Sequence, residues 1–212
     1  MESKEYGIAL DIDETLSWTL GHWVKEMQKR FGNPENLSVR DLITKYRYPE
    51  NVPYWQTQEA LDWKEDARNN NELQTQLGLM PGAAEGVAAL MKIVPISVYI
   101  TVRPVTILNG TKVWLKKYGF PTAEIIAKPV TVAHADGNKW KAEKLVGLYP
   151  RVQGVVDDNA GLLQFLPNSY KGHVFLYTHT TVPDNPLENV HVCPDWGSVV
   201  QQVERVFSKA TI

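Results

Sequence analysis

The feature that most limits what this chain can fold into is a series of six short apolar runs. They span residues 6–10, 95–101, 124–128, 153–158, 173–178 and 189–193. Runs of this length, bounded by polar and turn residues, are typical of buried strands. Helical patterns stand between several of them, at 105–119 and at 138–148, where Asn138 is the expected N-cap. Strands alternating with helices predict an α/β protein with a mostly parallel sheet flanked by helices.

The segment after the first apolar run has a different character. Residues 17–80 are rich in Trp, Tyr, Asn and Gln, and contain amphipathic helical patterns, one of which has Ser38 as its expected N-cap. A chain of 212 residues is long enough for one α/β core with a modest insertion. We therefore predict a core formed by residues 1–16 and 81–212, and a small α-helical cap domain formed by residues 17–80.

Composition excludes several classes of function. The net charge of -2 supplies no basic field, which argues against nucleic acid as a partner. No run approaches the ~18 apolar residues of a membrane span. Cys193 is the single cysteine, so no internal disulfide can form, and the five histidines are too scattered for a zinc site. The expected localisation is cytoplasmic. Nothing in the sequence indicates the oligomeric state.

Polar residues that could carry chemistry follow three of the predicted strands. The first strand leads into Asp11, Asp13 and Thr15, the second ends at Thr101, and a later one ends at the pair 157–158, both Asp. The carboxyl ends of parallel strands meet at one edge of a sheet, where reactive groups gather. Clustered carboxylates need a cation between them, and hard oxygen ligands favour Mg²⁺. One carboxylate can then attack a bound phosphoryl group while a neighbour transfers protons.

These residues, in this order, resemble the motifs of haloacid dehalogenase superfamily phosphatases. The Asp-x-Asp-x-Thr motif is matched by DIDET, the Ser/Thr motif by VYITVRP, and the acidic pair by VVDDN. The family's single basic residue at a helix start has three candidates. Lys141 is preferred because it stands four and seven residues before Leu145 and Leu148, at the start of an apolar helical stripe. Lys139 and then Lys128 are the alternatives.

The resemblance implies a role for each matched residue. Asp11 would be the nucleophile, and Asp13 would be the general acid and base. Asp11, Asp13 and Asp157 would bind Mg²⁺, Asp13 through its backbone carbonyl, with Asp158 in support. Thr101 and Lys141 would hold the phosphoryl oxygens. Arg103, two residues beyond Thr101, is interpreted as either a substrate contact or a surface salt bridge, and His179 as a structural residue.

The cap carries an unusual number of aromatic residues, which are Trp18, Trp23, Tyr46, Tyr48, Tyr54, Trp55 and Trp63. We expect most of them to form the cap's own core. Trp18 and Trp55 are the expected exceptions, available to stack on a substrate's base. Trp18 is included among the predicted substrate-binding residues because it stands three residues beyond Thr15.

Within the superfamily the layout is most similar to the 5'(3')-deoxyribonucleotidase group, which also has a small helical cap between the first two motifs. Two features depart from that group: Glu14 stands where it usually has Gly, and TVRP replaces its usual second-motif surroundings. The prediction is a Mg²⁺-dependent phosphomonoesterase that forms an aspartyl-phosphate, acting on a nucleotide or another small phosphorylated metabolite. The alternatives are a 3'-phosphatase on nucleic-acid ends, and a catalytically silent binding protein with the same fold.

Overall fold

The protein is built on one six-stranded parallel sheet, seen in a computed structural model that describes residues 6–184 and 187–208. The strand order is β3-β2-β1-β4-β5-β6, which places the first strand in the middle. The strands are β1 (Gly7–Leu10), β2 (Ile96–Pro104), β3 (Glu124–Lys128), β4 (Val152–Asp157), β5 (His173–Tyr177) and β6 (Val190–Cys193). The predicted fold class is confirmed, with β2 running three residues further than expected because Pro104 still pairs with Lys128.

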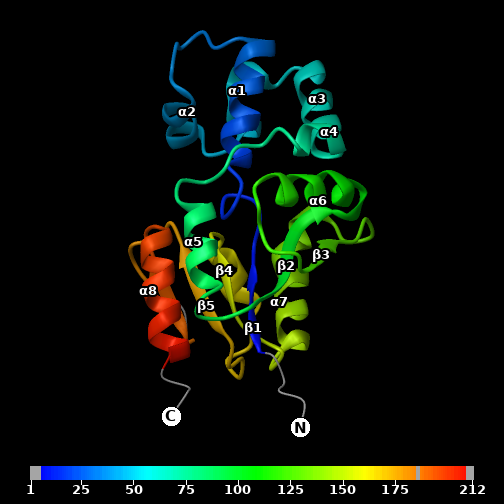
Figure 1. Cartoon of the computed structure of the whole chain (residues 1–212). Coiled ribbons are helices and arrows are strands. Elements are labelled where there is room, and N and C mark those ends of the chain that lie inside the picture. Colours follow the sequence, from blue (N-terminus) through cyan, green and yellow to red (C-terminus); the bar gives the residue numbers. More distant parts are fainter. Residues whose placement is uncertain (1–5, 185–186, 209–212) are drawn as a thin grey trace.

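Helices cover both faces of the sheet (Figure 1). The core helices are α5 (Ala83–Leu90), α6 (Leu108–Lys117), α7 (Gly137–Leu148) and α8 (Trp196–Phe207). Alternate residues of β1 point to opposite faces: Ile8 and Leu10 join one hydrophobic core with residues of α5, α6 and α8, whereas Ala9 joins another with residues of α7. The central strand is therefore buried on both sides, as parallel strands usually are.

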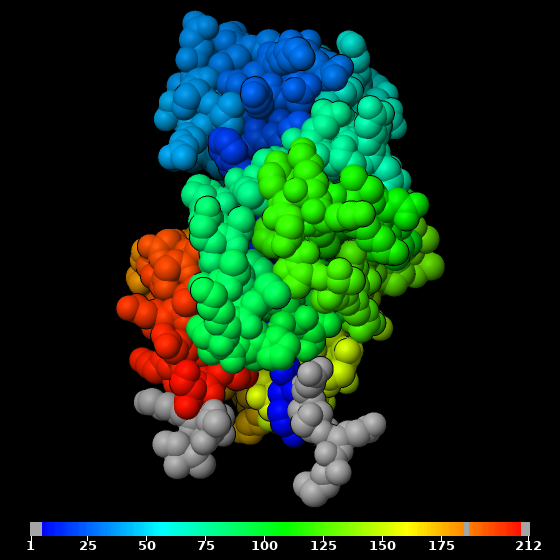
Figure 2. Space-filling model, in the orientation of Figure 1, coloured from blue at the N-terminus to red at the C-terminus, as the bar shows by residue number. Residues whose placement is uncertain are grey.

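The segment between β1 and β2 forms a helical lobe that stands beyond the carboxyl ends of the strands (Figures 1 and 2). Its helices are α1 (Thr19–Phe31), α2 (Val39–Tyr46), α3 (Gln58–Arg68) and α4 (Asn71–Gln74). The lobe has its own apolar core, which includes Val24, Met27, Leu42 and Trp55. We call this lobe the cap.

Two chain segments connect the cap to the sheet, and they run beside each other. The N–H of Trp18 donates to the carbonyl of Gly78 at 3.0 Å, and the N–H of Met80 donates to the carbonyl of Leu16 at 2.8 Å. The predicted domain limits fall at these connections, but the division into two domains stays a prediction. The ends of the predicted core, residues 1–5 and 209–212, lie outside the described residues.

The remaining short helices are single turns of 3-10 geometry, at Pro49–Asn51, Pro53–Trp55, Val105–Ile107 and His134–Asp136, and a longer one at Ala160–Phe165. The predicted N-cap at Ser38 is confirmed, since its hydroxyl accepts from the N–H of Asp41 at 3.1 Å. The predicted N-cap at Asn138 is wrong: α7 begins at Gly137, directly after the short helix at 134–136.

Across the part of the chain that the structure describes, no helix combines the length and apolar character needed to cross a membrane.

Candidate active site

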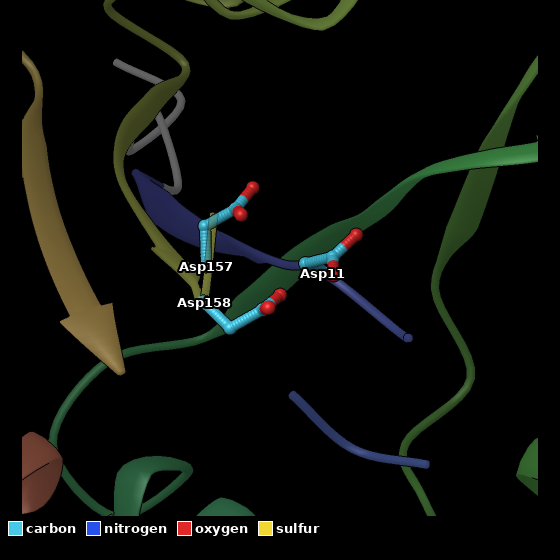
Figure 3. A group of neighbouring side chains, drawn as sticks. All are labelled: Asp11, Asp157 and Asp158. Carbon is cyan, nitrogen blue, oxygen red and sulfur yellow. The ribbon is translucent and has the colours of Figure 1, made fainter. Parts of the chain in front are cut away.

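Three aspartates from two neighbouring strands gather at the carboxyl edge of the sheet (Figure 3). Asp11 follows β1, and Asp157 and Asp158 end and follow β4. One carboxylate oxygen from each lies within 4.8 Å of those of the other two. The N–H of Asp11 donates to the carbonyl of Val156 at 2.9 Å, so the pairing of β1 with β4 continues to this point. The chain continues from β1 to β2 on one side and from β4 to β5 on the other side of the sheet order. Open α/β sheets bind their ligands at such a point.

Lys141 links two of these aspartates. Its Nζ donates to Asp11 Oδ1 and to Asp157 Oδ2, both at 2.6 Å, and the residue is only 3% exposed. Lys141 projects from α7, which packs on the ends of β2 and β3. Lys139 lies on the exposed side of the same helix, and Lys128 lies at the end of β3. Of the three candidate lysines, the structure therefore places Lys141 beside the predicted nucleophile.

Burial and the charges of neighbouring carboxylates disfavour negative charge on Asp11 and Asp158. Burial raises the pKa of Asp11 to about 7; Lys141 opposes that shift, while Asp157 and Asp13 add to it. Burial, followed by the charges of Asp11 and Asp157, also raises the pKa of Asp158 well above its usual value. Burial lowers the pKa of Lys141, but the two carboxylates outweigh that effect and raise it. The cluster therefore has one cation for three carboxyl groups, and a further cation would relieve the repulsion.

The donor set fits a hard divalent cation. Asp11, Asp157 and Asp158 supply carboxylate oxygens only, with no sulfur or imidazole ligand, and such sets suit Mg²⁺ better than zinc. The backbone carbonyl of Asp13 is the further ligand that the family resemblance predicts. The structure thus brings a possible metal-binding cluster together, and the identity of the metal stays a prediction.

The loop after Asp11 is held by buried contacts from distant parts of the chain. The hydroxyl of Thr15 lies 3.4 Å from both Asp11 Oδ2 and Asp158 Oδ1, and its carbonyl accepts from Trp196 Nε1 at 3.2 Å. His179 Nε2 donates to the carbonyl of Asp158 at 2.8 Å, which matches the structural role predicted for this histidine.

Glu14 adopts the backbone conformation that glycine tolerates best. Its φ is +54°, in the left-handed region that costs a residue with a side chain about 1 kcal/mol or more. The Oε1 of Glu14 accepts from the N–H of Leu20 at 2.5 Å, which ties this loop to the start of α1. Burial raises the pKa of Glu14 to about 7.

Asp13 is paired with Arg103, a partner that the sequence left undecided. Arg103 Nε lies 3.0 Å from both oxygens of Asp13, and Nη2 lies 2.8 Å from Oδ1. Arg103 therefore forms a salt bridge, as one of its two interpretations expected, but the arginine is only 5% exposed and does not lie on the surface. Its guanidinium also donates to Ser17 Oγ at 2.8 Å and Thr111 Oγ1 at 3.2 Å, and Thr19 Oγ1 donates to Asp13 Oδ1 at 2.5 Å.

This network holds Asp13 in its charged form. Burial raises the pKa of Asp13, but the charge and hydrogen bonds of Arg103 outweigh burial and lower it. Arg103 was missed as a site residue because nothing local distinguishes a buried arginine from an exposed one. The one available signal was its position two residues beyond Thr101 in the strand that precedes the site.

Thr101 is fully buried in β2, next to the central strand. Its Oγ1 accepts from the N–H of Arg103 at 3.2 Å. Contact with a phosphoryl oxygen, the predicted role of Thr101, stays a prediction.

A cavity of about 530 Å³ opens between the cap and the carboxyl edge of the sheet. Asp13, Glu14 and Arg103 are among its lining residues, and so are the aromatic residues Trp23 and Tyr48. The lining does not include the other predicted site residues, which are Asp11, Thr101, Lys141, Asp157 and Asp158.

Neither aromatic residue singled out from the sequence lines this cavity. Trp55 is fully buried in the cap, where its Nε1 donates to the carbonyl of Gly32 at 2.9 Å, so its expected exposure to substrate is wrong. The ring of Trp18 packs against Gly21, one turn further along α1. Stacking of Trp18 on a base stays a prediction, and the cavity lining does not favour it. Trp23 and Tyr48 line the cavity, where a stacking residue was expected.

The architecture is similar to that of several solved structures. A dehalogenase solved with an intermediate complex superposes with a TM-score of 0.56 at 15% identity, over 95% of this chain and 98% of that one. The chain has a haloacid dehalogenase-like fold. A HAD-superfamily hydrolase of subfamily IA, variant 1, from Geobacter sulfurreducens also gives 0.56, at 13% identity over 95% and 98%. A hydrolase from Pseudomonas syringae gives 0.50, at 16% identity over 95% and 99%.

No protein-family model matches the sequence, and no curated protein matches it. The fold is the one that the motifs predicted. The narrower similarity to 5'(3')-deoxyribonucleotidases stays a prediction.

Proposed function

We propose that this protein is a Mg²⁺-dependent phosphomonoesterase that forms a phosphoryl-aspartate on Asp11. The observation that carries the proposal is the buried cluster in which Lys141 bridges Asp11 and Asp157 while Asp158 stands close by. A structural ion pair needs one carboxylate per lysine. Three carboxyl groups around one lysine lower the stability of the folded protein, because their negative charges are not fully compensated. Such an arrangement is typical of a site that binds a cation and an anionic substrate.

The side chains suggest a two-step reaction. In the first step a carboxylate oxygen of Asp11 attacks phosphorus, and the bond between phosphorus and the leaving-group oxygen breaks. Asp13 donates a proton to the leaving-group oxygen. Water then attacks the phosphoryl-aspartate while Asp13 accepts its proton, and inorganic phosphate leaves. Lys141 holds Asp11 in position and offsets the negative charge that builds up on the phosphoryl oxygens.

Arg103 bears on the proton-transfer role proposed for Asp13. The ion pair favours the carboxylate, the form that accepts a proton from water in the second step. Donation in the first step requires Asp13 to be protonated, which the pair opposes. We infer that a bound phosphate monoester draws the guanidinium toward its own oxygens and so frees Asp13 to take up a proton.

Asp11, Asp13 and Asp157 would hold the metal ion, with Asp158 close enough to support it. Bound there, Mg²⁺ would neutralise part of the phosphate charge and so allow an anionic carboxylate to approach.

A nucleotide or another small phosphorylated metabolite is the proposed substrate. The cavity volume of about 530 Å³ is within the range of small-molecule sites. Trp23 and Tyr48 supply flat apolar surfaces on which a base could stack. The net charge of -2 argues against the long nucleic-acid substrates of the alternative 3'-phosphatase function.

The proposal is tested by phosphate release from a panel of monoesters, in Mg²⁺ and in EDTA. The wild-type protein should hydrolyse some of them only with Mg²⁺. Asp11→Asn should remove activity, because an amide cannot attack phosphorus, while Asp136→Asn, at an exposed aspartate, should not. Acid quenching should trap a phosphorylated protein only when Asp11 is present. Activity in a folded Asp11→Asn protein would contradict the covalent mechanism, and inactivity of the wild type on every monoester would favour the silent binding protein.

A further inference from the structure

Lys128 is a buried lysine in the cavity that the proposed reaction does not use. It is the last residue of β3, paired in register with Pro104 of β2, and it is 7% exposed. Its Nζ donates to the carbonyl of Val132 at 2.6 Å and approaches that of Pro129 at 3.4 Å. An ammonium has three N–H donors, so one remains for a ligand, and Lys128 lines the cavity.

Lys128 forms no ion pair with any carboxylate of residues 6–184 and 187–208. The acidic residues around the cavity are engaged elsewhere: Asp13 with Arg103, Glu65 with Arg68 at 3.2 Å, and Glu14 with the backbone of Leu20. Burying a cation is costly unless an anion or several strong acceptors compensate it, so the two carbonyls leave a strong preference for an anion.

Two other basic residues, Arg68 and His134, line the cavity beside Lys128, and Arg68 is paired with Glu65. Burial and the charges of Arg68 and Lys128 lower the pKa of His134, and Glu50 and Glu65 only partly offset them. Glu50 is itself paired with Lys64 at 3.4 Å. At His134 the charges of Arg68 and Lys128 therefore outweigh those of the two glutamates, and the neutral imidazole is favoured.

Lys128 and the proposed nucleophile belong to strands that are not neighbours in the sheet. In the sheet order β3-β2-β1-β4, two strand spacings separate Lys128 from the strand that carries Asp11. At ordinary spacing this is roughly 10 Å between strand axes. Lys141 donates to Asp11 and Asp157, whereas Lys128 donates to the carbonyl of Val132, so the two lysines could contact different ends of one small molecule.

We propose that Lys128 binds a second anionic group of the substrate, a carboxylate or a second phosphate carried several atoms from the phosphoryl group that reaches Asp11. This proposal rests on the proposed phosphomonoesterase function and narrows its substrate class. Hydrogen bonds to charged groups contribute enough to change a specificity constant about tenfold or more.

The test compares two matched pairs of substrates. Phenyl phosphate and 4-carboxyphenyl phosphate differ by a carboxylate, and adenosine 5'-monophosphate and adenosine 3',5'-bisphosphate differ by a phosphate. In at least one pair, the wild-type protein should have a kcat/KM for the second member about tenfold higher than for the first. The pair that shows the larger ratio identifies the kind of anion. Ratios of one or below in both pairs would overturn the proposal without any variant.

Variants then assign the preference to Lys128. Lys128→Met keeps the length of the side chain and should reduce the preferred ratio about tenfold, whereas Lys128→Arg should retain most of it. Lys112→Met, at an exposed lysine of α6, removes the same charge and should leave the ratio unchanged. A ratio unaffected by Lys128→Met would also overturn the proposal. If phenyl phosphate is hydrolysed but the ratios fail, the phosphomonoesterase function stands and only the second anion site falls; if no phosphate monoester is hydrolysed, both fall.

Discussion

Replacing Lys141 by alanine should destabilise the protein and inactivate it by one and the same cause. The side chain is 4% exposed and lies 2.6 Å from the carboxylates of Asp11 and Asp157, which are 5% and 0% exposed. Removing one partner of a buried ion pair costs about 3–5 kcal/mol, because the remaining charge has no compensation. We expect Lys141→Ala to lower the free energy of unfolding by about that amount in EDTA. Mg²⁺ should recover part of the loss, since a divalent cation also compensates the carboxylates.

The same substitution acts on the nucleophile. The pKa of Asp11 is already about 7, with Lys141 opposing the effect of burial. Without Lys141 the pKa of Asp11 rises further, and more of the carboxyl group is protonated at neutral pH and unable to attack. Loss of a preorganised electrostatic group alone costs about 100-fold in kcat, so we expect at least that for Lys141→Ala.

Urea denaturation in EDTA and in Mg²⁺, together with steady-state kinetics, measures both effects. Lys139→Ala is the matched control, an exposed lysine two residues away on the same helix. It should change the free energy of unfolding by no more than about 0.5 kcal/mol and leave kcat within a few-fold. A loss of stability below about 1 kcal/mol for Lys141→Ala would refute the reasoning that the carboxylates depend on this cation.

Three further predictions concern the metal, pH and the cap. Asp157→Ala should raise the Mg²⁺ concentration needed for half-maximal activity far more than Asp158→Ala; equal effects would reject the unequal roles assigned to them. Burial lowers the pKa of His191 to about 4, so its contribution to stability is complete above its unfolded pKa of about 6.5 and is lost as pH falls toward 4. Thermal melts of wild type and His191→Asn should therefore converge as pH falls through that range; a constant difference would contradict this pKa. Trp23→Ala should raise KM for a nucleotide more than for a small aryl phosphate, whereas Trp18→Ala should affect both alike; the opposite pattern would restore Trp18 as the stacking residue.

The side-chain contacts within the site could be predicted from the sequence only in part. The role of Asp13 was implied by the family resemblance, but its environment is decided by Arg103, which is 90 residues away along the chain. Lys141 could be preferred over Lys139 from a helical stripe, since a two-residue shift turns a side chain to another face of a helix. Lys128 stayed an alternative for the family's basic residue until the structure placed it at the end of β3, away from Asp11.

The alternation of apolar runs with helices determined the parallel sheet by itself, because backbone hydrogen bonding and burial leave few other arrangements for such a pattern. It also placed the three polar strand ends at one edge, since all parallel strands end there. The cap was different. Trp18, Trp23 and Trp55 are equally apolar in sequence, yet Trp55 forms the cap's core, Trp18 packs on Gly21, and Trp23 faces the cavity. Packing of whole helices against one another decides which aromatic ring faces a ligand, and that depends on contacts between residues far apart in the chain.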